Sequence, residues 1–348
     1  MASRIVGLDI GRDSLRAVEI ENADKARPVV VRYHEMPIPQ DAVRSGEVRE
    51  IHTVSSAIRK LWSAGGFKTK DVVLGMGNQR VLARDLTVPR MGIAQIRESL
   101  PFQVQDMLPV PVGEALLDFY PISEGDGEQG PVIHGLLIAA IKESVMANVN
   151  AVRNAGLNPV QVDLIPFALS RILVRGPMAR GTVAVIDIGA STTNFVVTTA
   201  GVPQFVRMIP AGGNDVNAAL MARLEMSPQQ AEGVKRARGL DVSGVQSEQE
   251  RMAVEQIRST TMELLTSLKN TLAYSSNTRQ SDPVQAIVLT GGGSQLAGLA
   301  QVLADLTHIQ VLPADAFSTL DVNKSLRRND KEPLSLTVAL GLALGSVA

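Results

Sequence analysis

Apolar residues recur in the same arrangement at two places in the chain. Residues 5–20 read IVGLDIGRDSLRAVEI, and residues 184–198 read AVIDIGASTTNFVVT. In both stretches an apolar run ends in Asp-Ile-Gly, a short polar turn follows, and a second apolar run begins. Short apolar runs bounded by turn residues are typical of buried strands. The pattern therefore predicts two β-hairpins, each with a carboxylate near the end of its first strand.

The remaining pattern predicts strands and helices in alternation. Apolar residues at helical spacing are separated by glycine or proline from shorter apolar or alternating runs. Helices are predicted at 51–67, within 91–112 (ending before Pro109), at 143–157, 214–226, 227–239 and 248–277, and at the apolar C-terminus. Strands are predicted at 28–38, 70–77, 81–89, 114–122 and 132–141, a strand, glycine turn and helix at 284–306, and polar loops at 123–131, 241–248 and 325–333.

The two hairpins indicate an internal duplication, because Asp9 and Asp187 are separated by about half of the 348-residue chain. Two related α/β halves are the simplest explanation. We expect a first core subdomain at 1–83 and 164–180, completed by a C-terminal helix at 334–348. A strand–helix–strand–strand–helix unit is expected as an insertion at 84–163. The second half is expected at 181–333, with a helical subdomain at about 214–283.

Composition narrows the functional classes. The chain has 34 basic and 35 acidic residues and a net charge of -1, which argues against a general nucleic-acid binder. It has no cysteine, so disulfides, thiolate zinc sites and a cysteine nucleophile are excluded. His34 and His52 lack the spacing of metal ligands. With no secretory signal and no apolar run of about 20 residues, a cytoplasmic protein without direct membrane insertion is expected.

The repeated turns carry the groups that a phosphate tail with its magnesium ion requires. Small residues let the backbone N–H groups approach the phosphates, hydroxyls add donors, and a carboxylate can hold the water shell of the metal. Taken alone, an Asp-x-Gly turn is an ordinary β-turn, but two of them half a chain apart favour a nucleotide site. The predicted phosphate-side residues are Asp9, Gly11, Ser14, Arg16, Asp187, Gly189, Ser191, Thr192 and Thr193, with Asp9 and Asp187 holding Mg²⁺ through water.

A third glycine-rich element joins a predicted strand to a predicted helix at 290–294, which reads TGGGS. Three successive glycines allow a flat ring or a phosphate to lie against bare backbone, and the helix that follows adds donors that favour anions. Gly291, Gly292, Gly293 and Ser294 are therefore added to the predicted nucleotide site. The chain has no Gly-x-x-x-x-Gly-Lys-Ser/Thr motif, so a P-loop protein is excluded.

The order of these motifs resembles the actin-like ATPase superfamily, which joins actin, the large heat-shock chaperones and the sugar kinases. Its two phosphate turns resemble 9–16 and 187–193, and its adenosine motif resembles 291–294. The resemblance implies a duplicated, two-lobed α/β fold of ribonuclease H-like type that binds ATP and Mg²⁺. RMIPAGGNDV (207–216) and AEGVK (231–235) resemble two further motifs of the FtsA–PilM branch. They imply that Gly212, Gly213, Glu232 and Lys235 belong to the site, the last two near the ribose.

Within this branch the chain resembles the PilM family of type IV pilus adaptors. The resemblance is carried by LPFQVQDMLPVPVGEALLDF (100–119) and LLTSLKNTLAYSSN (264–277). It implies that the N-terminal tail of a PilN-like membrane protein docks between the inserted domain and the first core subdomain. The predicted peptide contacts are Phe102, Met107, Leu108 and Val110, of which Phe102 and Met107 are expected to be the exposed ones. Leu100, Val104 and Phe119 are further candidates, although most of these apolar residues are expected to form the core of the insertion itself.

Three departures from the family pattern bear on catalysis. Arg16 stands where relatives usually have Lys, Arg12 and Asp13 stand in a turn that relatives fill with Ser and Thr, and Ile165 stands where relatives often carry an acidic residue. These departures favour ATP binding with slow or absent hydrolysis, and no catalytic residue is assigned.

The expected function is that of an ATP-binding adaptor recruited to the inner face of the cytoplasmic membrane through its PilN-like partner and other pilus components. Self-association is left open. The alternatives are an FtsA-like cell-division ATPase, which would need a basic amphipathic helix at its end, and a small-molecule kinase, which would need a further aspartate in the cleft. The sequence offers no obvious candidate for either feature.

Overall fold

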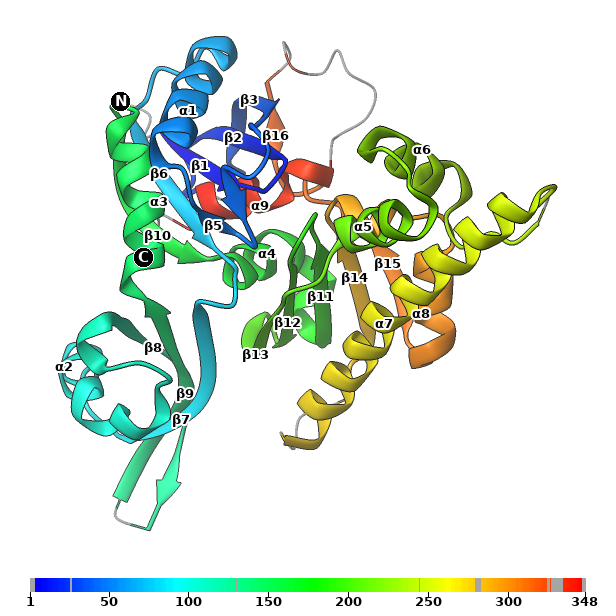
Figure 1. The fold of residues 1–348 in the computed structure, drawn as a ribbon. Helices are drawn as coiled ribbons and strands as arrows, with labels where there is room; N and C mark the ends of the chain where they lie inside the picture. The colour runs from blue at the N-terminus through cyan, green and yellow to red at the C-terminus, as the bar shows by residue number, and fades with distance from the viewer. Residues whose placement is uncertain are drawn as a thin grey trace.

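The computed structural model describes residues 4–25, 27–128, 130–243, 245–278, 283–323, 326 and 334–345. These residues form two lobes, each built on one sheet, and a smaller unit that projects from the first lobe (Figure 1). The predicted loop at 325–333 lies outside the described residues except for residue 326. No helix in the described ranges is long and apolar enough to cross a bilayer.

The first lobe contains a six-stranded sheet in the order β10-β6-β1-β2-β3-β16. Strands β1, β2 and β3 form an antiparallel meander, and β6 and β10 continue the sheet in parallel with β1. Figure 1 shows α1 and α3 on the outer side of this sheet, while α4 and α9 lie toward the second lobe. The bounds are β1 (Arg4–Ile10), β2 (Ser14–Glu21), β3 (Val29–Pro37), β6 (Asp71–Met76), β10 (Asn158–Leu164), β16 (Asp321–Val322), α1 (Ile51–Gly65), α3 (Lys142–Asn154), α4 (Ile165–Leu173) and α9 (Thr337–Ala343).

The second lobe repeats this arrangement in a five-stranded sheet of order β13-β12-β11-β14-β15. An antiparallel meander is again continued by two parallel strands on the side of its first strand. The duplication predicted from the two hairpins is therefore present in the topology. The bounds are β11 (Thr182–Ile188), β12 (Thr193–Thr199), β13 (Val202–Ile209), β14 (Ala286–Thr290), β15 (Gln310–Pro313), α5 (Gly213–Leu224), α6 (Pro228–Arg238), α7 (Glu248–Thr278) and α8 (Leu299–Thr307).

The projecting unit is a three-stranded antiparallel sheet of order β7-β9-β8 with one helix. It begins at Val81 and ends at Ile141, whereas the insertion was predicted at 84–163 with a second helix at its end. That second helix, α3, and the strand β10 that follows it belong to the first lobe, because β10 pairs with β6. One face of the sheet packs on α2 around Leu100, Val104 and Phe119. The other face packs on the first lobe, where the rings of Tyr120 and Phe167 lie 4.7 Å apart. The bounds are β7 (Val81–Pro89), α2 (Ile93–Gln103), β8 (Ala115–Gly127) and β9 (Gly130–Ile141).

Three local predictions differ from the structure. The helix expected within 91–112 ends at Gln103 and is followed by separate 3-10 turns at Gln105–Met107 and Val112–Glu114. Pro109 and Pro111 lie between these two turns and have no N–H with which a helix could continue there. The strand expected to end at residue 122 continues to Gly127, so most of the polar segment 123–131 is paired. A small hairpin of β4 (Val43–Arg44) and β5 (Glu47–Val48) was not predicted. The 3-10 turns are Gln105–Met107, Val112–Glu114, Gly176–Arg180, Gly292–Gln295 and Leu334–Leu336.

Candidate functional site

A cavity of about 1640 Å³ lies between the two lobes, where the ends of β1 and β11 face each other. Both hairpin turns, the loop after β14 and the first turn of α5 line it. The two turns share one backbone geometry: the Gly11 N–H donates to the Ser14 carbonyl at 3.1 Å, and the Gly189 N–H donates to the Thr192 carbonyl at 2.9 Å. The predicted convergence of the two turns on one cavity is therefore present.

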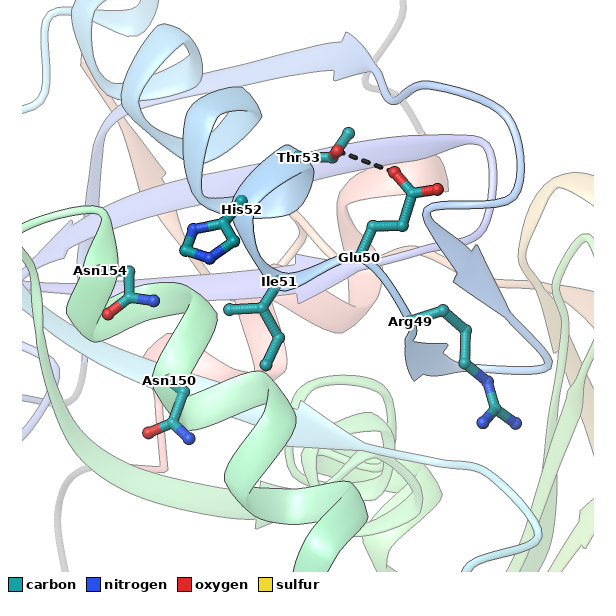
Figure 2. A pocket seen from close by; sticks show the side chains of 7 residues that line it. All are labelled: Arg49, Glu50, Ile51, His52, Thr53, Asn150 and Asn154. Atoms are coloured by element: carbon teal, nitrogen blue, oxygen red, sulfur yellow. Dashed lines mark hydrogen bonds between the residues drawn. The ribbon is translucent and has the colours of Figure 1, made fainter.

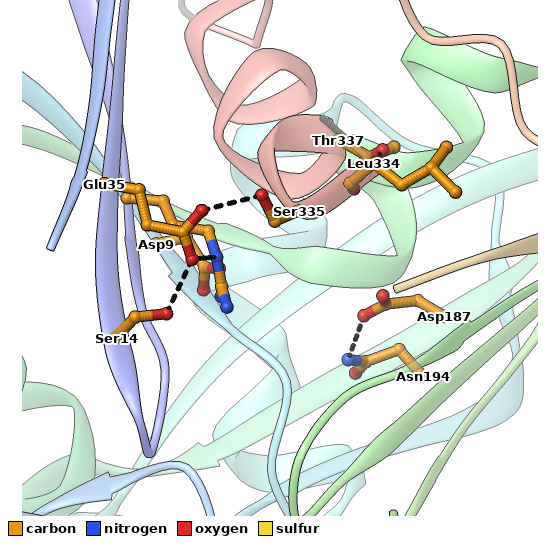
Figure 3. Close-up of polar contacts among 9 residues, drawn as sticks. Asp9, Ser14, Glu35, Asp187, Asn194, Leu334, Ser335 and Thr337 are labelled. Atoms are coloured by element: carbon orange, nitrogen blue, oxygen red, sulfur yellow. Dashed lines mark hydrogen bonds and ion pairs between the residues drawn. The ribbon is translucent and has the colours of Figure 1, made fainter. Parts of the chain in front are cut away.

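The first turn holds a cation between two carboxylates (Figure 3). Arg16, opposite Asp9 in the β1–β2 ladder, donates from Nη1 to Asp9 Oδ2 and from Nε to Glu35 Oε1, both at 2.9 Å. Glu35 also accepts from the hydroxyls of Ser14 and Ser335, at 2.9 and 2.8 Å. Burial raises the pKa of Asp9, and the charge of Arg16 opposes that rise only in part. The Arg16 side chain is thus fixed by the protein before any ligand arrives.

The second turn presents a carboxylate, that of Asp187, which forms no ion pair with the described residues, although the charge of Arg16 is near enough to lower its pKa slightly. Asn194 occupies the ladder position opposite Asp187 and donates from Nδ2 to Asp187 Oδ2 at 3.2 Å. Burial raises the pKa of Asp187 to about 6, the charge of nearby Asp9 adds to the rise, and the Asn194 hydrogen bond opposes it. Asn194 itself is buried, and its Oδ1 has no hydrogen-bond partner. The floor of the cavity therefore holds the Asp187 carboxylate and Asn194 Oδ1, which can accept further hydrogen bonds or bind a cation.

The loop after β14 lies against the second turn because it consists of glycine. Gly291 has a φ of 84°, and a Cβ there would be 2.5 Å from Asp187 Oδ1. A Cβ at Gly212 would be 2.6 Å from the Gly189 carbonyl, so the start of α5 also packs on this turn. Gly292 has open space around it. These residues leave bare backbone facing the cavity, as the sequence predicted.

Helix α6 adds a cluster of charge on the second lobe. Glu232 accepts from Lys235 Nζ and from Asn217 Nδ2, each at 2.7 Å, and from Arg236 Nε at 2.5 Å. Burial would raise the pKa of Glu232, but these donors outweigh burial and lower it to about 2. Lys235 Nζ also donates to the Gly213 carbonyl at 3.1 Å. Glu232 therefore remains an ionised acceptor beside the glycine-rich backbone.

Most of the predicted nucleotide residues line the cavity, and two do not. The Thr193 hydroxyl is turned away and donates to the Ala211 carbonyl at 2.7 Å, because Thr193 begins β12 and is fully buried. The Ser294 hydroxyl donates to the Gly291 carbonyl at 2.7 Å, within its own turn. The lining residues are Asp9, Gly11, Ser14, Arg16, Asp187, Gly189, Ser191, Thr192, Gly212, Gly213, Glu232, Lys235, Gly291, Gly292 and Gly293.

Among the cavity residues that the sequence analysis missed, three lie in the hydrogen-bond networks described above. Asn194 follows Asp187 at the spacing at which Arg16 follows Asp9, so aligning the two hairpins would have found it. Glu35 and Asn217 lie in no motif and could be found only from the fold.

A second, smaller hollow of about 610 Å³ lies at the start of α1 beside α3 (Figure 2). It is lined by short polar and exposed residues, among them His52 and Asn154, and Thr53 donates to Glu50 at 2.8 Å. Its lining has neither glycine-rich backbone nor a buried charged group. We therefore assign it no ligand.

The predicted peptide contacts differ in exposure. Phe102 on α2 is 87% exposed, whereas Met107 and Leu108 are half-buried against the core of the projecting unit. Val110 is also half-buried. The further candidates Leu100, Val104 and Phe119 are buried in that core.

The comparisons with known proteins agree with this architecture. A family model described as type IV pilus assembly protein PilM matches residues 7–347. The solved structure of a PilM-PilN type IV pilus biogenesis complex is similar with a TM-score of 0.83 and 28% identity, covering 98% of this chain and 97% of that one. MreB 5 of Spiroplasma citri bound to AMPPNP is similar in fold, with a TM-score of 0.52, 11% identity, and coverage of 91% of this chain and 93% of that one.

Curated relatives are cell division proteins FtsA. The Bacillus subtilis protein is 24% identical over 260 residues, which are 67% of this chain and 58% of that protein. The Pseudomonas aeruginosa protein is 23% identical over 346 residues, which are 88% of this chain and 82% of that protein. The chain thus spans little more than half the length of the B. subtilis relative.

Proposed function

Because the chain belongs to the PilM family of type IV pilus assembly proteins, we propose that it is an adaptor of a pilus assembly machine that binds ATP between its two lobes. The observation that carries this proposal is the meeting of both hairpin turns and Gly291–Gly293 around one cavity. Glycine-rich backbone and hydroxyl groups from these three segments face the cavity and can donate hydrogen bonds to phosphates. The ionised Glu232 can accept hydrogen bonds from a ribose. The proposal places the protein at the inner face of the cytoplasmic membrane through a PilN-like partner.

Magnesium fits the oxygen groups on the cavity floor. Asp9, Asp187 and the unpartnered Oδ1 of Asn194 are all oxygen donors. In the described parts of the chain no group of three acidic or histidine side chains is arranged to hold a metal directly. Mg²⁺ usually keeps several waters and binds through one or two carboxylates plus phosphate oxygens. We therefore expect Asp9 and Asp187 to hold the ion through its waters.

The arrangement favours slow or absent hydrolysis. Rapid phosphoryl transfer to water needs a group that orients the attacking water. Asp9 and Glu35 are already engaged by Arg16, and Asp187 is engaged by Asn194. Ile165, at the start of α4, lines the cavity beside Gly75 and Gly77 and offers only an apolar side chain. We assign no catalytic residue.

Titration of the purified protein with nucleotides tests the proposal. Calorimetry should give saturable binding of ATP in the presence of Mg²⁺ and much weaker binding when EDTA removes the metal. AMP, which lacks the phosphates that the turns would hold, should bind more weakly than ATP. If no adenine nucleotide produces heat in the presence of Mg²⁺, the nucleotide part of the proposal is wrong.

We further propose that the N-terminal peptide of a PilN-like protein contacts the projecting unit at Phe102. The Phe102 side chain is 87% exposed, and aromatic side chains are enriched in protein interfaces, where they can act as anchors. Deleting the whole insertion would be a poor test, because its sheet covers apolar residues of the first lobe, as the Tyr120–Phe167 contact indicates. A point substitution on the exposed face is sharper.

Replacing Phe102 with serine should weaken binding of that peptide at least about 10-fold, since an aromatic anchor contributes roughly 2 kcal/mol or more. Thermal unfolding should be nearly unchanged, because little of the ring is buried. Fluorescence anisotropy with the labelled peptide measures the first effect, and a melting curve the second. The control is Val242→Ser, an exposed apolar residue on the second lobe. Equal peptide affinity for wild type and Phe102→Ser would contradict the placement.

The FtsA relatives support a second candidate, a division ATPase that polymerises on membranes. Sedimentation with ATP and liposomes separates the two functions. The pilus adaptor should stay in the supernatant, whereas an FtsA-like protein should pellet with the vesicles.

A further inference from the structure

Asp13 and Asn214 join the two lobes across the nucleotide cavity. Asp13 lies in the first hairpin turn, Asn214 lies in the first turn of α5, and both line the cavity. Asn214 Nδ2 donates to Asp13 Oδ2 at 2.8 Å. The Asp13 side chain is 56% exposed, which puts this bond at the solvent-facing rim rather than at the floor. At the floor, the lobes are joined by the buried Thr290 and Thr337 hydroxyls, 3.0 Å apart.

The bond at the rim continues as a chain of amides into the second lobe. Asn217 Nδ2 donates to Asn214 Oδ1 at 3.2 Å and to Glu232 Oε2 at 2.7 Å. The hydrogen bonds therefore run in one direction: Asn217 donates to Asn214, and Asn214 donates to Asp13. Glu232 at the far end is the residue expected near the ribose. The Oδ1 of Asn217 is buried and has no hydrogen-bond partner in the described residues.

We propose that Asp13 and Asn214 form a latch between the lobes at the rim of the cavity, and that Asn217 couples the latch to the sugar end of the nucleotide. The inference rests on the proposed nucleotide function. While the bond is made, the lobes are held together at both floor and rim, so a nucleotide can enter or leave only after the bond breaks. A sugar hydroxyl that donates a hydrogen bond to Glu232 would displace Asn217 from it. Asn217 also donates to Asn214 Oδ1 and so orients the Asn214 amide. Occupancy of the sugar end therefore loosens the latch through side chains that are already in contact.

The kinetic test uses Asp13→Ala, Asn214→Ala and the double variant, with a fluorescent ATP analogue and Mg²⁺ in stopped flow. Each single variant should raise both the association and the dissociation rate constants about three- to tenfold, the worth of one hydrogen bond. The double variant should resemble either single variant, because both remove the same bond. The exchange Asp13→Asn with Asn214→Asp keeps a donor facing an acceptor and should restore rates near those of wild type. Asp305→Ala, an exposed aspartate bonded only within α8, is the control.

The coupling is tested separately with Asn217→Ala, which should move the rates in the same direction as Asn214→Ala. If Asn217→Ala leaves them unchanged while the latch variants alter them, the coupling to the sugar end is wrong. Unchanged rates in both single latch variants, or a change with Asp13→Ala alone, would overturn the latch and leave only a charge effect.

A second readout needs no nucleotide. The chain has no cysteine, so cysteines introduced at exposed Lys60 on α1 and Asn270 on α7 can carry a pair of spin labels without other changes. The ligand-free protein should give a narrow distance distribution, and Asn214→Ala should broaden it toward longer distances. Identical distributions would overturn the latch. If the wild type binds no nucleotide while these distributions differ as expected, the proposed function fails and the latch stands.

Discussion

Replacing Asp187 with asparagine is expected to weaken magnesium-dependent nucleotide binding about 10- to 100-fold, the usual loss when a group that supports a metal is removed. The same substitution is expected to make the ligand-free protein more stable at neutral pH. Both effects follow from one feature: Asp187 is buried, and its side-chain hydrogen-bond partner among the described residues is the neutral amide of Asn194. An ionised carboxylate is unfavourable there until a cation arrives.

The stability effect has a defined pH dependence. Burial raises the pKa of Asp187 from 3.8 to about 6, so the unfolded chain loses this proton more readily than the folded protein. The folded state is therefore penalised progressively as the pH rises from about 4 to 6, and fully above that range, by about 2 to 3 kcal/mol. Asp187→Asn removes the penalty. Urea unfolding should show the variant more stable than wild type at pH 7.5 and equal to it near pH 4.

Asp9→Asn is the matched comparison, because Asp9 occupies the same position in the repeated hairpin but is paired with Arg16. Burial raises the pKa of Asp9 as well, but its removal also deprives the half-buried Arg16 of one partner, so the gain in stability at pH 7.5 should be smaller than in Asp187→Asn. Calorimetry with ATP and Mg²⁺ measures the binding effect in both variants. Unaltered binding in Asp187→Asn, together with unaltered stability at pH 7.5, would contradict the role given to this carboxylate.

The hairpins could be predicted because their information is local. Apolar periodicity fixed the strands, and the Asp-Ile-Gly turns fixed where the chain reverses, so the cavity could be anticipated from two short segments. The end of α2 at Gln103 was less predictable, since apolar residues continue to recur between Gln103 and Pro109 and nothing local marks the end of the helix. Glu35 shows a further limit. It reaches the site because β3 lies beside β2 and places it against Arg16, and nothing in its own sequence neighbourhood signals this.

Contacts between the two lobes, such as the bond between Asp13 and Asn214, could not be predicted from sequence patterns. From the sequence, Asp13 is only an acidic residue in a turn that the related proteins fill with Ser and Thr. Asn214 is only the first residue of a predicted helix. Their bond depends on how the two sheets are set against each other. That setting is determined by α4 and α9, which lie between the sheets and pack closely because of small residues (Figure 1).

Helix α9 is held on both sides by glycine contacts. A Cβ at Gly7 on β1 would overlap the Ala339 carbonyl of α9, and a Cβ at Gly341 on α9 would overlap the Ala168 carbonyl of α4. All residues of α9 are buried. Ser335, two residues before α9 begins, donates a hydrogen bond to Glu35. Thr337, the first residue of α9, accepts one from Thr290. The seating of α9 therefore affects both the first phosphate turn and the floor of the cavity.

Replacing Gly341 with alanine should lower the free energy of unfolding by about 1 to 3 kcal/mol, as overpacked buried sites do. Helix propensity alone predicts the opposite sign, a gain of about 1 kcal/mol, so the experiment decides between propensity and space. The matched control is Gly233→Ala in α6, where an added Cβ meets nothing within 4 Å and only the propensity gain should remain. Denaturant unfolding measures both variants. A gain in stability for Gly341→Ala would show that α9 can move away from α4 without loss. The structure argues against this, because the helix is also confined by Gly7 on its other side.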